Sequence, residues 1–199
     1  HTRGSPAVAR ALRFLEREQE PEGSWFGRWG VNHIYGTGAV LPALEALGVD
    51  MRSRSVQRAA DWLVGHQNPD GGWGESCVSY MDPRARGRGP STPSQTAWAL
   101  LGLCAAARPE DARARRQGVA WLLEHQSEGT WPEELYTGTG FPGYGGGRRV
   151  RLEDPGRRGR IAQGVELSRA FMIRYDMYRH YFPLMALGRL RRRGLLGDG

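Results

Sequence analysis

The pattern of polar and apolar positions divides the chain into helices of two kinds. The first kind is amphipathic and recurs three times, in stretches that end near Gln19, Gln67 and Gln126. The second kind is apolar on nearly every side, as in AVLPALEALGV (39–49) and STPSQTAWALLGLCAAA (91–107). An amphipathic helix buries one face, whereas a wholly apolar helix must be enclosed by other elements. The alternation predicts an outer and an inner layer of helices, and because no segment is a confident strand we expect an all-α fold.

The amphipathic stretches form a sequence repeat. They read FLEREQEPEGSW (14–25), WLVGHQNPDGGW (62–73) and WLLEHQSEGTW (121–131). In each, a glutamine ends the helical run, a turn with glycine follows, and a tryptophan closes the unit. Glycine permits the sharp turn, and we expect the tryptophan to return over the glutamine, whose amide bonds nearby backbone ends. The repeat residues are Gln19, Trp25, Gln67, Trp73, Gln126 and Trp131.

The spacing of the repeat predicts helical hairpins arranged in a ring. Successive repeat tryptophans lie 48 and 58 residues apart, which suits one outer and one inner helix for each unit. We therefore expect an α/α-toroid of the α/α6-barrel type, with roughly half a barrel present as a single partial domain over residues 1–199. Within it, we expect an inserted loop rich in glycine and arginine at 144–170.

Three glycines have the spacing of a dinucleotide-binding turn: Gly138, Gly140 and Gly143. Such a turn follows a strand and opens a helix whose N-terminus holds the phosphate. Here no predicted strand precedes the glycines, and Pro142 opposes an immediate helix. We exclude the dinucleotide site and expect the glycines to present Phe141 instead.

The charge of the chain is strongly positive. The net charge is +7, and all 28 basic residues are arginine. The arginines gather in two clusters, and arginine clusters of this kind occur in solvated loops or bind a nucleic acid or an anionic lipid surface. No recognised nucleic-acid module frames them, so between the two partners we favour lipid headgroups over nucleic acid. The clusters are Arg148, Arg149, Arg151, Arg157, Arg158 and Arg160, followed by Arg189, Arg191, Arg192 and Arg193.

Cysteine and histidine usage predicts neither a disulfide framework nor a metal site. Cys77 and Cys104 form no CxxC pair, so we expect two reduced thiols. The five histidines are scattered without ligand spacing, and we expect no metal. No stretch approaches the ~18 consecutive apolar residues of a membrane-spanning helix, and no signal peptide is visible. These features favour a cytoplasmic protein that contacts a membrane from one side at most.

Three longer strings resemble the C-terminal third of bacterial squalene–hopene cyclases. They are GSWFGRWGVNHIYGTGAVLPAL, GGWGESCVSYMDP with STPSQTAWALL, and YTGTGFPG with YDMYRHYFPLMALGR, in a resemblance that covers about residues 7–193. The resemblance implies an α/α-barrel enzyme that cyclises squalene to hopene or hopanol in a hydrophobic cavity, with no metal or organic cofactor. It also implies monotopic association with the cytoplasmic face of the bacterial inner membrane, and a homodimer when full length.

The resemblance also implies which side chains meet the substrate. Tyr35 matches a residue near the catalytic acid that helps return a proton from solvent; its alternative is a buried tyrosine whose hydroxyl caps a helix. Aromatic faces attract cations and donate no lone pair, which suits a cavity that stabilises carbocations. By spacing, FMIRYDMY (171–178) places three rings on one helical face, and ordinary core is the alternative. The cavity residues implied are Trp29, Phe141, Phe171, Tyr175 and Tyr178.

Two features depart from the family pattern. The family's proton donor is an Asp-x-Asp-Asp run, and the aspartates of this chain all stand apart, while Glu133–Glu134 and Glu153–Asp154 read as solvated pairs. We therefore expect this chain to be inactive without the missing N-terminal part of the same enzyme. The segment 144–170 resembles an insertion carried by a subset of the family. For this segment three alternatives stay open: it covers the cavity mouth, it contacts lipid headgroups, or it is a disordered loop. Pro183 is expected to end one helix or to open the last one.

Two alternative functions remain open from the sequence. The chain is either part of a cyclase for another polyprenoid, such as a shorter terpene, or a non-catalytic half-toroid that binds lipid. The aromatic residues and the arginine clusters suggest the lipid-binding half-toroid, and the squalene–hopene cyclase remains the first hypothesis.

Overall fold

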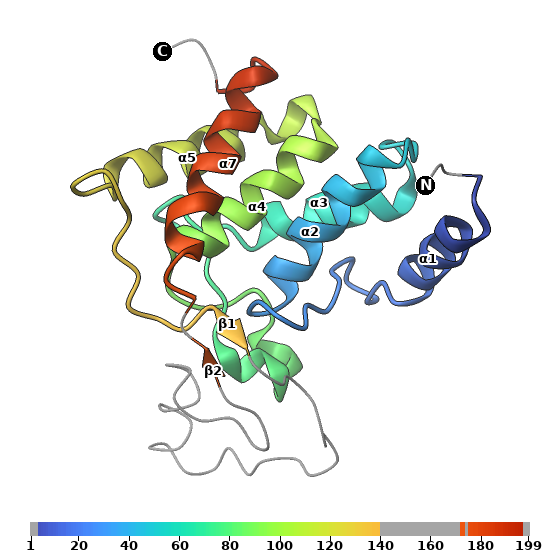
Figure 1. Cartoon of the computed structure of the whole chain (residues 1–199), viewed down its shortest axis with the longest axis horizontal. Coiled ribbons are helices and arrows are strands. Elements are labelled where there is room, and N and C mark those ends of the chain that lie inside the picture. The colour runs from blue at the N-terminus through green and yellow to red at the C-terminus, as the bar shows by residue number, and fades with distance from the viewer. Residues whose placement is uncertain (1–3, 140–171, 174, 197–199) are drawn as a thin grey trace.

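The structure is a computed structural model that describes residues 4–139, 172–173 and 175–196 (Figure 1). Short 3-10 turns occur at Cys77–Tyr80, Pro83–Ala85 and Pro109–Asp111. The fold is all-α, of the toroid type predicted, apart from one pair of two-residue strands. In chain order the elements are α1 (Pro6–Arg17), α2 (His33–Ala46), α3 (Arg54–Gly65), α4 (Pro93–Ala106), α5 (Ala112–Glu124), β1 (Gly138–Thr139), β2 (Met172–Ile173) and α7 (Tyr178–Arg192).

Three helices form the inner layer of the molecule. Helices α2, α4 and α7 lie side by side, with α4 between the other two (Figure 1). Every residue of α4 is buried, as expected for a helix that is apolar on nearly every side. Helix α2 approaches α4 closely at Gly38, where an added Cβ would lie 2.3 Å from the backbone oxygen of Trp98. The inner helices therefore form one tightly packed unit.

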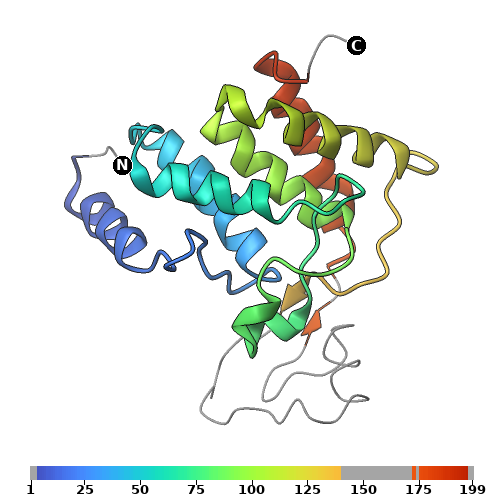
Figure 2. The same ribbon diagram turned by 180° about the vertical axis from the view of Figure 1, so that it is seen from behind.

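The amphipathic helices form the outer layer. Figure 2 shows α3 and α5 in front of α4, on the side opposite to the view of Figure 1. Both helices contact α4, and α3 buries Val56, Trp62 and Leu63 on its inner side. Helix α1 contains no buried residue, although Leu12 and Leu15 pack against the common core. The two predicted layers are confirmed.

The start of α4 follows a capping residue, whereas the start of α2 does not. Thr92 is the N-cap of α4, where its hydroxyl accepts a hydrogen bond from the Gln95 amide and Pro93 occupies the first turn. Helix α2 begins at His33, six residues before the apolar run that predicted it. This earlier start places Tyr35 within the first turn of an inner helix.

The repeat tryptophans join each turn to the helix before it. Each indole Nε1 donates a hydrogen bond of 2.7 Å to a backbone oxygen of that helix, from Trp25 to Leu15, from Trp73 to Leu63 and from Trp131 to Leu122. The glycines of the three turns have positive φ angles of 109°, 90° and 78°, which only glycine adopts at low cost. The expected turn geometry is confirmed in all three units.

The repeat glutamines join each unit to the next outer helix. The Gln19 amide donates to the oxygens of Gly23 and Ser55, both at 2.8 Å, so that it binds both its own turn and the start of α3. Gln67 repeats this arrangement with Gly71 and with Ala114 at the start of α5. Gln126 is exposed and forms no hydrogen bond with another described residue. The third unit therefore has the tryptophan contact without the glutamine bridge.

Two local predictions near the C-terminus are wrong. Pro183 neither ends nor opens a helix, because it lies inside α7, which continues from Tyr178 to Arg192. The proline lies in the second turn, so the helix loses one amide hydrogen bond near its start and continues on later ones. Residues 171–178 do not form one helical face, since Met172–Ile173 is strand β2, paired with β1. The backbone hydrogen bonds between β1 and β2 therefore decide the local structure, although the spacing of the aromatic residues suits a helix.

Candidate functional site

A short backbone ladder brings three distant segments together below the inner helices. Gly30 forms an antiparallel bridge with Gly138, and the Val31 amide donates to the Thr137 oxygen at 2.9 Å. Gly138 in turn pairs with Ile173 across β1 and β2. The segment around Gly30, strand β1 and strand β2 therefore meet at one place, and Figure 1 shows the two strands side by side.

The loop that carries Trp29 is fixed from both sides. The Tyr80 hydroxyl lies 2.9 Å from the Gly30 oxygen, to which it donates, and the Asn32 side-chain oxygen accepts from the Gly27 amide at 3.2 Å. Trp29 itself is 44% exposed. Trp29 is therefore exposed among the described residues, and it directly precedes Gly30 of the ladder.

Tyr35 is held in a narrow slot between two glycines and an indole. A Cβ atom added to Gly27 would lie 2.6 Å from Tyr35 Cδ1, and one added to Gly30 would lie 2.5 Å from Tyr35 Cγ. On α4, the Trp98 ring meets the Tyr35 ring edge-on, with 4.9 Å between ring centroids. Burial raises the pKa of Tyr35 above its usual value of 10, with a further contribution from Tyr175. The phenol therefore remains protonated at neutral pH.

The tyrosines of the last segment join the same cluster. Tyr175 stacks on Tyr178 with 4.6 Å between ring centroids, and the Tyr178 ring meets Trp98 edge-on at 5.7 Å. Phe182, one turn further along α7, meets Trp98 edge-on at 5.4 Å. Burial also raises the pKa of Tyr178. Rings from α2, α4 and α7 thus converge in one place, which the sequence spacing alone did not predict.

The structure places four of the six predicted aromatic site residues. Tyr35 and Tyr178 contact the same indole, Tyr175 joins them through Tyr178, and Trp29 lies on the adjoining loop. Phe141 and Phe171 lie outside the described residues, as does the expected insertion at 144–170. No hydrogen bond joins the Tyr35 hydroxyl to another described residue, so within that part of the chain the hydroxyl does not cap a helix.

Two buried glutamates were missed by the sequence reasoning. Glu75 Oε2 accepts hydrogen bonds from the Asn32 and Ile34 amides at the start of α2. Glu133 accepts from the amide and hydroxyl of Ser94 at the start of α4, each at 2.8 Å. Each carboxylate lies at a helix N-terminus, where the helix dipole favours negative charge. The prediction that Glu133 belongs to a solvated pair is wrong, because Glu133 is buried and links the third unit to α4.

A shared position in the repeat marks both glutamates. Each lies two residues after a repeat tryptophan, in Trp73-Gly74-Glu75 and in Trp131-Pro132-Glu133. Burial raises the pKa of both carboxyl groups, against the lowering effect of their backbone donors. The Trp-x-Glu spacing was thus the signal that could have found them.

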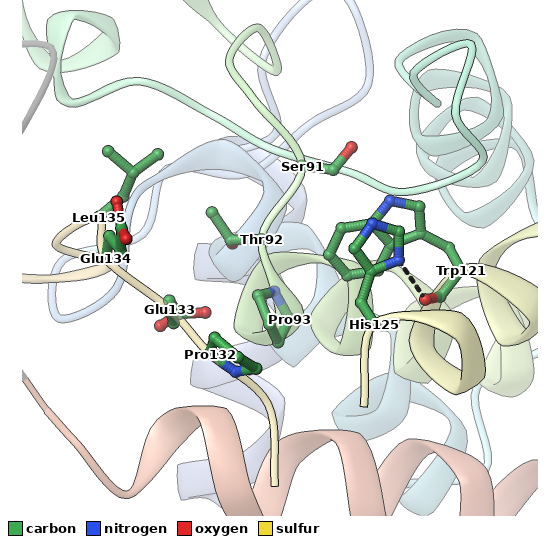
Figure 3. Close-up of a pocket in the computed structure, with 9 residues that line it drawn as sticks. All are labelled: Ser91, Thr92, Pro93, Trp121, His125, Pro132, Glu133, Glu134 and Leu135. Atoms are coloured by element: carbon green, nitrogen blue, oxygen red, sulfur yellow. Dashed lines mark hydrogen bonds between the residues drawn. The ribbon is translucent and has the colours of Figure 1, made fainter. Parts of the chain in front are cut away.

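A pocket of about 240 Å³ lies between the second and third units. In Figure 3, the His125 ring stacks on Trp121, and its Nδ1 bonds the Trp121 oxygen at 2.8 Å. None of the predicted aromatic site residues lines this pocket. Its lining residues are Ser91, Thr92, Pro93, Trp121, His125, Pro132, Glu133, Glu134 and Leu135 (Figure 3).

The remaining reactive groups are enclosed in the core. Cys77 and Cys104 are both free and buried, as expected for reduced thiols, and burial raises the pKa of Cys77 to about 12. His33 bonds the Ser24 hydroxyl at 2.8 Å, and burial lowers its pKa to about 4. In the described ranges, no three His, Cys, Asp or Glu side chains are placed to share a metal ion, and no helix has the length and hydropathy to cross a bilayer.

Comparisons with known proteins agree with this architecture. The chain is 51% identical over 185 residues to the squalene–hopene cyclase of Alicyclobacillus acidocaldarius, and 44% identical over 192 residues to a probable squalene–hopene cyclase of Sinorhizobium fredii. These matches cover 92% and 96% of this chain and 25% and 26% of the relatives. A solved protein from Actinoplanes has a similar fold, with a TM-score of 0.62, 19% identity, and coverage of 94% of this chain and 52% of that one.

The chain therefore spans about a quarter of the length of the curated relatives it matches. A sequence model described as the squalene-hopene cyclase C-terminal domain matches residues 1–145. That range contains the three repeat units, the Trp29 loop and Tyr35. The chain belongs to the squalene–hopene cyclase C-terminal domain family.

Proposed function

We propose that the chain supplies part of the wall of the hydrophobic cavity in which a squalene–hopene cyclase folds squalene and cyclises it to hopene or hopanol. The observation that supports this most is the convergence of Tyr35 and Tyr178 on Trp98, beside the loop that carries Trp29. Family membership supplies the reaction class, and this cluster supplies aromatic rings where the family strings meet.

The side chains of the cavity wall must stabilise the positive charge of the carbocation without reacting with the cation. Cyclisation of a polyene moves a carbocation from ring to ring, and an aromatic face attracts a cation by about 2 kcal/mol when the site is desolvated. Tyr175, Tyr178 and Trp29 would supply such faces, together with Phe141 and Phe171. Since about 1.4 kcal/mol corresponds to a tenfold change in rate, several rings together change a barrier by orders of magnitude. Water must stay outside until the last cation forms.

Tyr35 has a different role in this proposal. Its phenol is partly buried, and its raised pKa keeps the proton on the oxygen at neutral pH. A neutral hydroxyl both donates and accepts hydrogen bonds, which suits a group that passes a proton from solvent toward the catalytic acid. Tyr35 therefore helps to return the proton to the catalytic acid between turnovers, while the other rings stabilise the cations.

The acid itself is the part that this sequence does not contain. No Asp-x-Asp-Asp run occurs in the chain, and the buried carboxylates Glu75 and Glu133 are occupied with the N-termini of α2 and α4. We infer that the chain is inactive alone and works with an upstream part of the same enzyme that carries the acid.

The membrane surface is a second proposed partner, at the cytoplasmic face of the inner membrane. A cleft of about 500 Å³ at the C-terminal end of α7 is lined by Arg189, Arg192 and Arg193, with Glu45 paired to Arg193. Arginines bind phosphate oxygens through paired donors. Flotation with vesicles of anionic and neutral lipid tests this: anionic vesicles should carry the chain, and replacement of Arg189 and Arg192 by Gln should abolish it. Equal flotation with both lipids would contradict the proposal.

The cyclisation is tested by restoring the upstream region. The chain alone, incubated with squalene, should leave it linear, whereas a polypeptide that joins the chain to an upstream Asp-x-Asp-Asp region should release pentacyclic product detectable by mass spectrometry. A matched control replaces the aspartates of that run by Asn. If the restored protein binds squalene and leaves it linear while it cyclises a shorter polyprenoid, the proposed substrate is wrong. If it cyclises neither, the proposed reaction is wrong, and a folded monomeric chain that floats with anionic vesicles would favour the lipid-binding half-toroid.

A further inference from the structure

We propose that Trp98 is a positioning residue that holds the rings of Tyr35 and Tyr178 in place on the cavity wall. The inference deepens the proposed function and depends on it for the meaning of the two tyrosines. It concerns a residue of α4 that neither the spacing of the aromatic residues nor the family strings singled out as part of the site.

The indole is the common neighbour of rings from two other helices. Trp98 meets Tyr35 of α2 at 4.9 Å between centroids and Tyr178 of α7 at 5.7 Å, with interplanar angles of 70° and 78°. Phe182 meets it at 5.4 Å and 79°. Edge-on contacts of this kind are directional, because the positive edge of one ring faces the negative face of the other. Trp98 therefore constrains the orientation of each ring as well as the distance.

The indole is itself held firmly. Trp98 is 2% exposed in a helix whose residues are all buried. Its backbone oxygen lies 2.3 Å from the position that a Cβ on Gly38 would take, and its Cη2 lies 3.0 Å from the position of a Cβ on Gly30. Rings that contact a fixed indole are fixed in turn, so the position of α4 is transmitted to Tyr35 and Tyr178.

The polar edge of the indole argues against a role as core filler alone. Trp98 Nε1 is buried and has no hydrogen-bond partner among the described residues. A buried donor without a partner is unfavourable, and a purely apolar side chain at this position would avoid that loss. The repeat tryptophans Trp25, Trp73 and Trp131 each satisfy the same group with a backbone oxygen. Trp98 differs from them in that its contacts are with the site aromatics.

Without the indole, Tyr35 would lose one side of its slot. The glycines at 27 and 30 leave no room on the other sides, so the ring would shift toward the space that Trp98 vacates. Tyr178 would lose the same support while it kept its stack on Tyr175. A cavity wall with displaced rings stabilises the late cations less well and releases products in which fewer rings have closed.

The experiment compares Trp98→Leu and Trp98→Phe with a matched control, Trp121→Leu. Trp121 is an equally buried tryptophan, but it lies on the outer helix α5, where it stacks on His125 and donates to Asp70. The first readout is the titration of the tyrosines in the 199-residue chain, followed by NMR of ring-labelled tyrosine and assigned with Tyr35→Phe. We expect the pKa of Tyr35 to fall toward 10 in Trp98→Leu, because water reaches the phenol, and to stay unchanged in Trp121→Leu.

The second readout is the product distribution of the polypeptide restored with the upstream acid. Trp98→Leu should raise the share of incompletely cyclised product about tenfold. A tenfold change is the effect expected from the loss of about one directed aromatic contact. Trp98→Phe, which keeps an aromatic edge, should recover most of the complete product. Equal titrations and equal products in Trp98→Leu and Trp121→Leu would overturn the inference. If the unmodified restored protein leaves squalene linear, the proposed function fails, while the titration still decides whether Trp98 positions Tyr35.

Discussion

Replacement of Gly30 by alanine tests the slot that holds Tyr35. The new Cβ would lie 2.5 Å from both Cγ and Cδ2 of the Tyr35 ring and 3.0 Å from the Trp98 ring. Ordinary carbon contacts lie at about 3.5–4.0 Å, so the tyrosine ring must retreat by about 1 Å. It has little room to do so, because Gly27 and Trp98 close the other sides. The φ angle of Gly30 is not in the left-handed region, so the clash is the cause of any effect.

The cost follows from the rigidity of these neighbours. Overpacking of a well-packed site typically costs about 1–3 kcal/mol, and a slot closed on several sides belongs in the middle of that range. We therefore expect Gly30→Ala to lower the free energy of unfolding by about 2 kcal/mol. Urea denaturation followed by circular dichroism measures it, with an unchanged m value as the sign that the unfolded state is the same.

Gly188→Ala provides the matched control. Gly188 lies in α7, and a Cβ at that position has no atom within 4 Å. Alanine favours helix over glycine, so this variant should gain up to about 1 kcal/mol. A Gly30→Ala protein that unfolds within about 0.5 kcal/mol of the parent would show that the Tyr35 ring is not confined. That result would refute both the slot and the reasoning that gives Tyr35 a fixed place.

Three further predictions concern the joints between units. Gln67→Ala should lower the free energy of unfolding by about 1–3 kcal/mol, because the oxygens of Gly71 and Ala114 lose their donor, whereas Gln126→Ala should change it little; equal effects in denaturation would contradict the glutamine bridge. Glu133→Ala should cost about 3 kcal/mol by leaving the buried Ser94 amide and hydroxyl without an acceptor, while Glu134→Ala, on an exposed neighbour, should stay within about 0.5 kcal/mol. Because burial raises the pKa of Glu75 and Glu133 above the value in the unfolded chain, the folded protein binds more protons in that window, and stability should fall as pH rises from about 4.5 through the folded pKa. Glu75→Gln should flatten this slope in denaturation curves recorded across pH; an unchanged slope would show that Glu75 does not titrate there.

The periodic elements could be predicted from the sequence because their causes are local. The all-α class, the two layers, the start of α4 at Thr92 and Pro93, and the positive φ angles of the turn glycines follow from hydrophobic pattern, capping and backbone freedom. The roles of Gln19 and Gln67 were predicted in kind, as bonds to backbone ends. Their partners Ser55 and Ala114 were not, since these lie 36 and 47 residues away.

The errors arose where long-range contacts decide the local structure. Helical spacing placed Phe171, Tyr175 and Tyr178 on one face, but Met172 and Ile173 pair with Gly138 and Thr139 as strands. Pattern alone gives no account of such a ladder, because the paired residues lie 33 and 35 positions apart in the sequence. Glu133 was misread for the same reason: an acidic pair in a loop looks solvated until the N-terminus of α4 is placed against it.

The candidate site was predicted in composition and only partly in arrangement. The resemblance supplied Trp29, Tyr35, Tyr175 and Tyr178, and the structure brings the three tyrosines together. The residue that joins them, Trp98, was hidden in an apolar helix, where nothing in the periodicity separates a junction from core. Such a junction is visible only once three helices are in place.

The central claim is that this chain lines a cavity that holds a polyprenoid hydrocarbon. A photoreactive squalene analogue, activated in the polypeptide restored with its upstream acid and mapped by mass spectrometry of proteolytic peptides, tests it most directly. We predict that the label attaches to the peptides that carry Trp29, Tyr35 and Tyr178, and that excess squalene prevents the attachment. Attachment to the outer helices α3 and α5 instead, with those three peptides unlabelled, would contradict the account.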